Sequence, residues 1–124
     1  MQTMRVFDLG TSPAPSASVT SAGPGARAAV LLDEGRATVR RIELHAGGMI
    51  PPCRMSEDVV FVVLRGSVVV TCGPDEELVA APGAVYIPGG AATRSLRALE
   101  PSLLLAVQCK GTHAEPPAPS AQAT

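Results

Sequence analysis

Short runs of apolar residues, most of them rich in valine or leucine, are separated by Gly, Pro and Asp turn signals along the middle of the chain. This punctuation is typical of an all-β protein. No window holds an apolar stripe of helical spacing longer than two turns, and Pro101 interrupts the nearest candidate. The pattern predicts short strands over residues 26–32, 36–44, 58–64, 67–72, 77–80, 84–87, 92–97 and 102–108.

A set of valine-rich strands leaves unpaired edges unless the sheet closes on itself or packs against a second sheet. The pattern therefore predicts an all-β sandwich or jelly roll. The length of 124 residues suits one domain. Both ends of the chain are rich in Pro and small residues, which bury too little surface to order themselves. We predict an extended lead-in over residues 1–25, a folded barrel over 26–110 and a flexible tail over 111–124.

Charge and composition exclude several classes of function. The chain has 10 basic and 11 acidic residues and no basic block, so we expect no nucleic-acid partner. With no Trp, one Tyr and two Phe, it has too few rings for a base-stacking platform. No apolar run approaches the ~20 residues of a membrane helix, and the polar N-terminus is unlike a signal peptide. Three widely spaced cysteines are typical of free thiols, so we predict a cytoplasmic protein without a membrane partner.

Two stretches of the sequence resemble the two conserved motifs of the cupins. The first is RRIELHAGGMIPPCRMSEDVVFVVLRGSVVV (residues 40–70), with a Gly-Gly turn at its centre and a hydrophobic strand that ends at Gly66. The second is APGAVYIPGGAATRSL (residues 81–96). The resemblance covers about Arg40 to Gln108. It implies a single-domain β jelly-roll barrel with a pocket inside the barrel, and it implies a homodimer.

The resemblance also identifies the positions at which cupins usually hold a divalent metal, through three His and one Glu. In this sequence those four positions carry Cys53, Met55, Val59 and Thr93. The glycines and prolines of the scaffold are present while every usual ligand differs. The resemblance therefore implies the scaffold of a cupin without its usual metal chemistry, and we expect no cofactor at this site.

Alternation along the strands indicates which side chains share a face. Residues two apart in a strand point the same way, so we expect Cys53 with Met55 and the row from Val59 to Val63 to face the interior. Arg97 is an even number of residues from Thr93 and so shares its inward face, where it would hold a ligand carboxylate. Arg94 would then point outward. The predicted pocket is largely apolar and is lined by Cys53, Met55, Val59, Phe61, Val63, Tyr86, Thr93 and Arg97.

Three hypotheses of function follow from this reading. The first, which we prefer, is a non-catalytic binding, sensing or carrier protein for a small apolar or weakly acidic ligand. The second is a metal-dependent oxidoreductase or isomerase, or a metal-handling protein, that holds Cu or Zn through Cys53 and Met55. The third is an interaction protein whose barrel is filled by its own side chains. Neither His45 nor His113 has a nucleophile at a meaningful spacing, so we assign no catalytic residue. Metal content separates the second hypothesis from the others, and a void of a few hundred cubic ångströms separates the first from the third.

Overall fold

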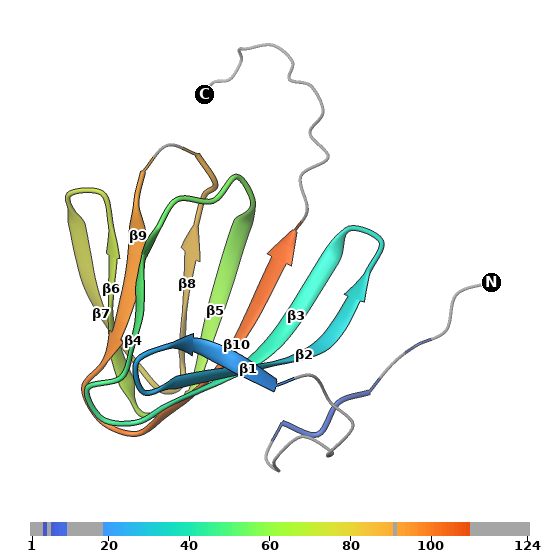
Figure 1. The fold of residues 1–124 in the computed structure, drawn as a ribbon, viewed down its shortest axis with the longest axis horizontal. Coiled ribbons are helices and arrows are strands. Elements are labelled where there is room, and N and C mark those ends of the chain that lie inside the picture. Colours follow the sequence, from blue (N-terminus) through green and yellow to red (C-terminus); the bar gives the residue numbers. More distant parts are fainter. Residues whose placement is uncertain (1–3, 5, 10–18, 91, 110–124) are drawn as a thin grey trace.

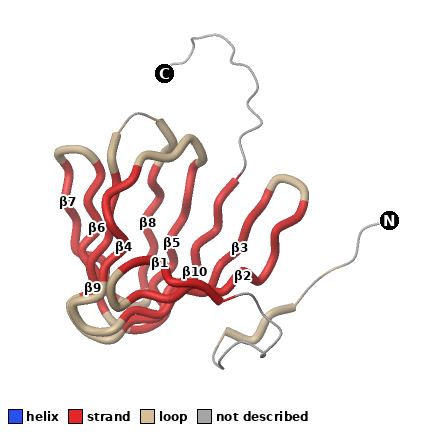
Figure 2. Tube along the Cα trace, viewed as in Figure 1, coloured by secondary structure: helices blue, strands red, loops and turns tan. Residues whose placement is uncertain are grey.

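A computed structural model of the chain describes residues 4, 6–9, 19–90 and 92–109. These residues form ten strands and no helix (Figures 1 and 2). The strands make two antiparallel sheets that face each other as a jelly roll, which confirms the predicted fold class. No helix in the described part of the chain is long and apolar enough to cross a membrane.

The two sheets contain strands from all parts of the sequence. The six-stranded sheet has the order β1 (Val19–Gly23), β2 (Ala26–Glu34), β3 (Ala37–Leu44), β10 (Ser102–Cys109), β5 (Asp58–Arg65) and β8 (Gly83–Ile87). The four-stranded sheet has the order β4 (Met49–Cys53), β9 (Arg94–Ala98), β6 (Ser67–Cys72) and β7 (Asp75–Ala80). Strands far apart in sequence are therefore neighbours, as in the pairing of β10 with β3 and β5.

Eight of these strands overlap the eight predicted ranges, and β1 and β4 were not predicted. Strand β4 contains Pro51 and Pro52, which cannot donate to a ladder, and it accordingly lies at the edge of its sheet with a bulge between Ile50 and Cys53. Strand β1 is short and polar, and it lies within the range predicted as a lead-in. The predicted tail over 111–124 lies outside the described residues.

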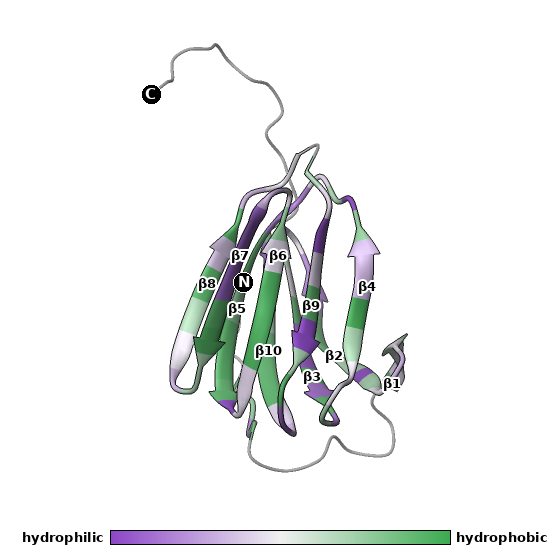
Figure 3. Ribbon diagram, turned by 90° about the vertical axis from the view of Figure 1, so that its left-hand side faces the viewer, coloured by the Kyte–Doolittle hydropathy of each residue, from purple (hydrophilic) through white to green (hydrophobic). Residues whose placement is uncertain are grey.

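The core lies between the two sheets. Leu104 of β10, Val63 of β5 and Val68 of β6 are its largest fully buried side chains. Leu104 is paired in register with Ile42 on one side and Val63 on the other, so the centre of the larger sheet carries a continuous apolar row. Figure 3 shows that β5, β6 and β10 are predominantly hydrophobic, whereas β7 carries a hydrophilic stretch at the opposite edge from β4.

The outer face of the larger sheet holds an ion pair between a buried arginine and a partly exposed glutamate. Arg41 of β3 is buried there, and its Nη1 forms a salt bridge with Glu43 on the same strand. Arg41 Nε also donates to the carbonyl oxygen of Leu9 at 3.3 Å. The segment that contains Leu9 therefore contacts this outer face, and Arg40, the next residue on β3, points to the opposite side, into the barrel.

Candidate functional site

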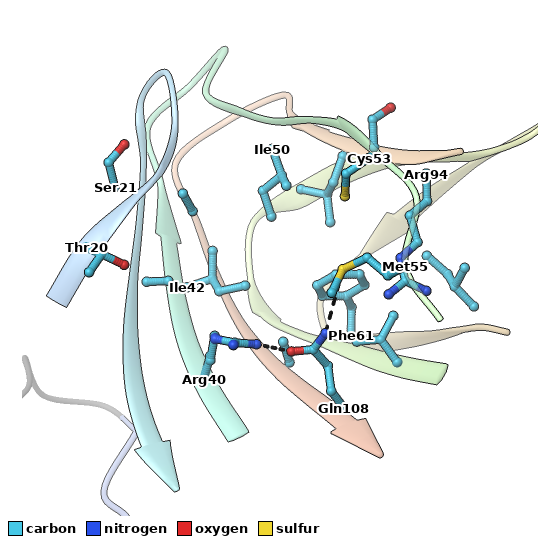
Figure 4. A pocket seen from close by; sticks show the side chains of 17 residues that line it. Thr20, Ser21, Arg40, Ile42, Ile50, Cys53, Met55, Phe61, Arg94 and Gln108 are labelled. Carbon is cyan, nitrogen blue, oxygen red and sulfur yellow. Dashed lines mark hydrogen bonds between the residues drawn. The ribbon is translucent and has the colours of Figure 1, made fainter. Parts of the chain in front are cut away.

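A cavity of about 290 Å³ lies inside the barrel, between the two sheets (Figure 4). A void of this volume favours a ligand site over a barrel filled by its own side chains. Most of its wall is apolar. The main apolar side chains come from strands β3, β4, β5, β8, β9 and β10 and are Ile42, Ile50, Phe61, Ile87, Leu96 and Ala106.

The mouth of the cavity lies beside β1 and the end of β4. Thr20 and Ser21 of β1 line the cavity and are exposed to solvent, as is Cys53 at the end of β4. These two strands are joined through the β1–β2 turn, because the Met49 N–H donates to the carbonyl oxygen of Pro24 at 2.9 Å. The opening of the cavity is therefore bordered by two hydroxyls and one thiol.

A row of polar side chains crosses another part of the cavity. Arg40 Nη1 donates to Gln108 Oε1, and Gln108 Nε2 donates to Met55 Sδ at 3.9 Å, a long and weak bond (Figure 4). Gln108 is only 7% exposed, so its amide depends on these protein partners. The charge of Arg40 is thus partnered by a neutral amide.

Arg94 is the second cation of the cavity and the more buried of the two. It is 6% exposed and begins β9, where it is paired in register with Cys53 on one side and Cys72 on the other. Figure 4 shows its side chain extending past Met55 at the cavity wall. Its Nη1 donates to the carbonyl oxygen of Glu57 at 3.1 Å. Within the described ranges Arg94 forms no ion pair, and no Asp or Glu side chain lines the cavity.

The loop at residues 89–90 holds Met55 and the Glu57 carbonyl in place. The Gly90 N–H donates to the Met55 carbonyl at 3.0 Å, and the Gly89 N–H donates to Asp58 Oδ1 at 2.7 Å. A Cβ on Gly89 would lie 2.0 Å from the carbonyl oxygen of Ser56, so only glycine permits this close approach. The tight contact between residues 55–58 and 89–90 thereby fixes one wall of the cavity.

Four of the eight predicted pocket residues line this cavity. Cys53, Met55, Val59 and Phe61 do so. Val63 is fully buried in the apolar core and does not line it. The remaining three are exposed and lie away from its wall: Tyr86, Thr93 and Arg97.

The predicted orientation of β9 was wrong. Arg94, Leu96 and Ala98 are buried, whereas Arg97 is exposed, so the even-numbered residues face inward. The strand pairs with β4 and β6 in a register that directs Leu96 and Ala98 to the core, and Arg94 follows their parity. The alternation of Leu96 and Ala98 was the signal in the sequence that pointed to Arg94. The pocket is consequently less apolar than predicted, because Arg40, Arg94 and Gln108 also line it.

Tyr86 lies on the outer face of β8 and is 58% exposed. Partial desolvation of its hydroxyl raises the pKa of Tyr86, and the charge and hydrogen bond of Asp58 raise it further. We expect Asp58→Asn to lower the pKa of Tyr86 toward its ordinary value without reaching it, because the desolvation remains. The chain has one Tyr and no Trp, so the ultraviolet absorbance of the tyrosinate measures this pKa directly.

The matched control for this titration is Asp75→Asn, an exposed carboxylate in β7 that does not contribute to the pKa of Tyr86. It removes the same charge and is expected to leave the titration curve in place. An unchanged pKa in Asp58→Asn would contradict the placement of Asp58 beside the Tyr86 hydroxyl.

The residues at the expected metal positions do not fit the usual metal site of cupins. Val59 has no donor atom, and Thr93 is exposed and does not line the cavity. Cys53 and Met55 are left as the two sulfur side chains on the cavity wall. The described residues contain no group of three His, Cys, Asp or Glu side chains placed to hold a metal ion. A soft metal at Cys53 and Met55 would therefore need a ligand from elsewhere.

Two facing antiparallel sheets around an internal cavity form a jelly roll, and the structures that it resembles are cupins. The chain resembles KdgF from Halomonas sp., with a TM-score of 0.68 and 17% identity over 76% of this chain and 88% of that chain. It resembles an RmlC-like cupin from Shewanella frigidimarina, with a TM-score of 0.70 and 13% identity over 82% of this chain and 91% of that one.

A third similar structure is the oxalate decarboxylase of Bacillus subtilis, described for its Mn(II) centres. The TM-score is 0.69 at 18% identity, over 80% of this chain and 29% of that chain. No protein-family model matches the sequence, and no curated protein sequence matches it as a relative. The similar structures confirm the resemblance to cupins at the level of the fold, and a fold alone does not define an activity.

Proposed function

We propose that this protein is a non-catalytic binding protein that holds a small organic molecule in the cavity of its barrel. The observation that carries the proposal is the cavity itself, about 290 Å³ with a mainly apolar wall and a few convergent polar groups. Ligand sites in proteins combine these features, and this volume is near the small end of their range. In this proposal the protein acts in the cytoplasm as a homodimer, two expectations carried over from the sequence.

The side chains around the cavity favour binding over catalysis. A covalent mechanism needs a nucleophile beside a base. Cys53 is the nucleophile at the mouth, and it is paired across the strands with Arg94, a residue that does not act as a base. His45 is exposed and does not line this cavity. We therefore assign the cavity a sensing or carrier role.

The test is binding of toluene and benzamide, two small neutral probes, measured by methyl NMR on the reduced protein. We expect shifts of Ile42, Ile50 and Leu96 methyl groups, because these side chains line the cavity. Ala106→Leu adds bulk to the cavity wall and should abolish the shifts, whereas Ala84→Leu adds the same bulk on the exposed face of β8 and should retain them. Absence of cavity shifts with both probes would refute the proposal.

The same preparation separates the soft-metal hypothesis from the binding proposal. What favours that hypothesis is that Cys53 and Met55 both line one cavity. Elemental analysis after exposure to Cu(I) or Zn(II) and desalting would then find metal that is lost in Cys53→Ser. Retained metal of this kind would replace the non-catalytic role with a redox or metal-handling one.

A further inference from the structure

We propose that the ligand of the cavity is a small carboxylate with an apolar body, and that Arg94 binds its carboxylate group. The inference rests on the proposed binding function and names the class of ligand. Arg94 supplies the charge at the wall, and the apolar body lies against Ile50, Phe61 and Leu96. Figure 4 shows Arg94 and Arg40 on either side of Met55 and Gln108, and both arginines line the same cavity.

The first reason is the unmet hydrogen-bonding capacity of Arg94. Its side chain is more than nine-tenths buried, yet within the described ranges its one hydrogen bond goes to the carbonyl oxygen of Glu57. A guanidinium has five N–H donors and stays charged in proteins. Burying a charge without a counter-charge is unfavourable, so native proteins pair such groups. The unpaired donors of Arg94 lie at the wall of a cavity that has room for the missing anion.

The second reason is the sign of the charge around the cavity. Two arginines line it and no carboxylate side chain among the described residues does. Arg40 is hydrogen-bonded to the neutral amide of Gln108, which leaves its positive charge uncompensated. The whole chain has a net charge of −1, so the positive character belongs to the cavity and not to the protein in general. A low-dielectric wall strengthens the attraction of such a site for an anion.

The geometry of the donors favours a carboxylate over a larger oxyanion. The planar fork of arginine matches the two oxygens of a carboxylate with two parallel hydrogen bonds. Phosphate sites usually add several backbone N–H groups or a helix N-terminus, and the described residues contain no helix. The predominantly apolar wall then accommodates the rest of a small organic acid.

The experiment compares benzoate with benzamide, a neutral molecule of nearly the same shape, by methyl NMR titration. We expect wild-type protein to bind benzoate about ten-fold more tightly than benzamide. One pair of hydrogen bonds between the arginine guanidinium and a carboxylate can supply this preference. Arg94→Gln should greatly reduce this preference and leave only the weaker attraction of Arg40. Arg97→Gln removes the same charge from an exposed side chain of the same strand, so it should keep the preference.

The outcomes distinguish a failure of the carboxylate inference from a failure of the proposed binding function. Equal affinities in wild type, or a preference for benzoate that is undiminished in Arg94→Gln, would overturn the carboxylate inference while leaving the binding function intact. Cavity shifts with none of toluene, benzamide and benzoate would overturn both. If Arg94→Gln does not fold, Arg94→Lys keeps a charge without the planar fork and should weaken benzoate while sparing benzamide.

A second readout needs no variant. Cys53 lies at the mouth of the cavity and is paired with Arg94 on the neighbouring strand. Cys109 is an exposed thiol at the end of β10. Alkylation by iodoacetate, a carboxylate, and by neutral iodoacetamide can be followed at each thiol by peptide mass spectrometry. We expect the ratio of iodoacetate to iodoacetamide rates to be several-fold higher at Cys53 than at Cys109. A ratio that is equal or lower at Cys53 would contradict the attraction of carboxylates to this cavity.

Discussion

Gly66→Ala is expected to lower the free energy of unfolding by about 4 kcal/mol or more, which places it among the exceptional substitutions. Gly66 connects β5 to β6 with a φ of +86°, a backbone conformation that residues with a Cβ rarely adopt. An added Cβ would also lie 2.2 Å from Ser102 Oγ and 2.5 Å from the carbonyl oxygen of Pro101. The carbonyl oxygen of Pro101 cannot move aside without shifting the start of β10, which pairs with both β3 and β5.

The control for Gly66→Ala is Gly35→Ala in the turn between β2 and β3. Gly35 also has a positive φ, +58°, but a Cβ there meets no atom within 4 Å. Its replacement should cost only about 1–2 kcal/mol, the strain of the backbone conformation alone. Urea denaturation followed by circular dichroism measures both variants. Equal losses would contradict the close packing of the β5–β6 turn against Pro101 and Ser102.

Arg94→Met is expected to raise the free energy of unfolding by about 2 kcal/mol in the absence of ligand. Methionine fills a similar volume beside Met55 and the apolar wall, and it removes a buried charge that has no carboxylate partner among the described residues. The hydrogen bond to the Glu57 carbonyl is lost, but a single bond of this kind contributes less than the burial of the charge costs. A gain in stability on removal of Arg94 is the result expected for a residue that serves binding at the expense of stability.

Arg97→Met is the control for Arg94→Met, because it removes the same charge from an exposed position on the same strand. It should change the free energy of unfolding by no more than about 0.5 kcal/mol. Both variants are compared by urea denaturation at one salt concentration. If Arg94→Met is instead destabilising by more than Arg97→Met, Arg94 serves to hold residues 55–58 in place, and the case for an anion at this residue weakens.

The candidate site was only half predictable from the sequence, and β9 illustrates why. Two parities were available for this strand. The cupin motif pointed to Thr93 and hence to Arg97, whereas Leu96 and Ala98 pointed to Arg94. A strand of five residues with charges on both faces does not decide between them by itself. The same ambiguity applied to Arg40 and Arg41 on β3, which the structure resolves by placing Arg41 on the outer face.

The sequence by itself determined the class of the fold and much of its core. Period-two alternation, valine-rich runs and Gly or Pro turns are local properties, so eight strands and the inward row from Val59 to Val63 followed from them. The tertiary structure decided which arginines enter the barrel and that a cavity remains there. Both depend on the pairing of β9 with β4 and β6 and on the opposing sheet, contacts between residues far apart in the chain that no local pattern specifies.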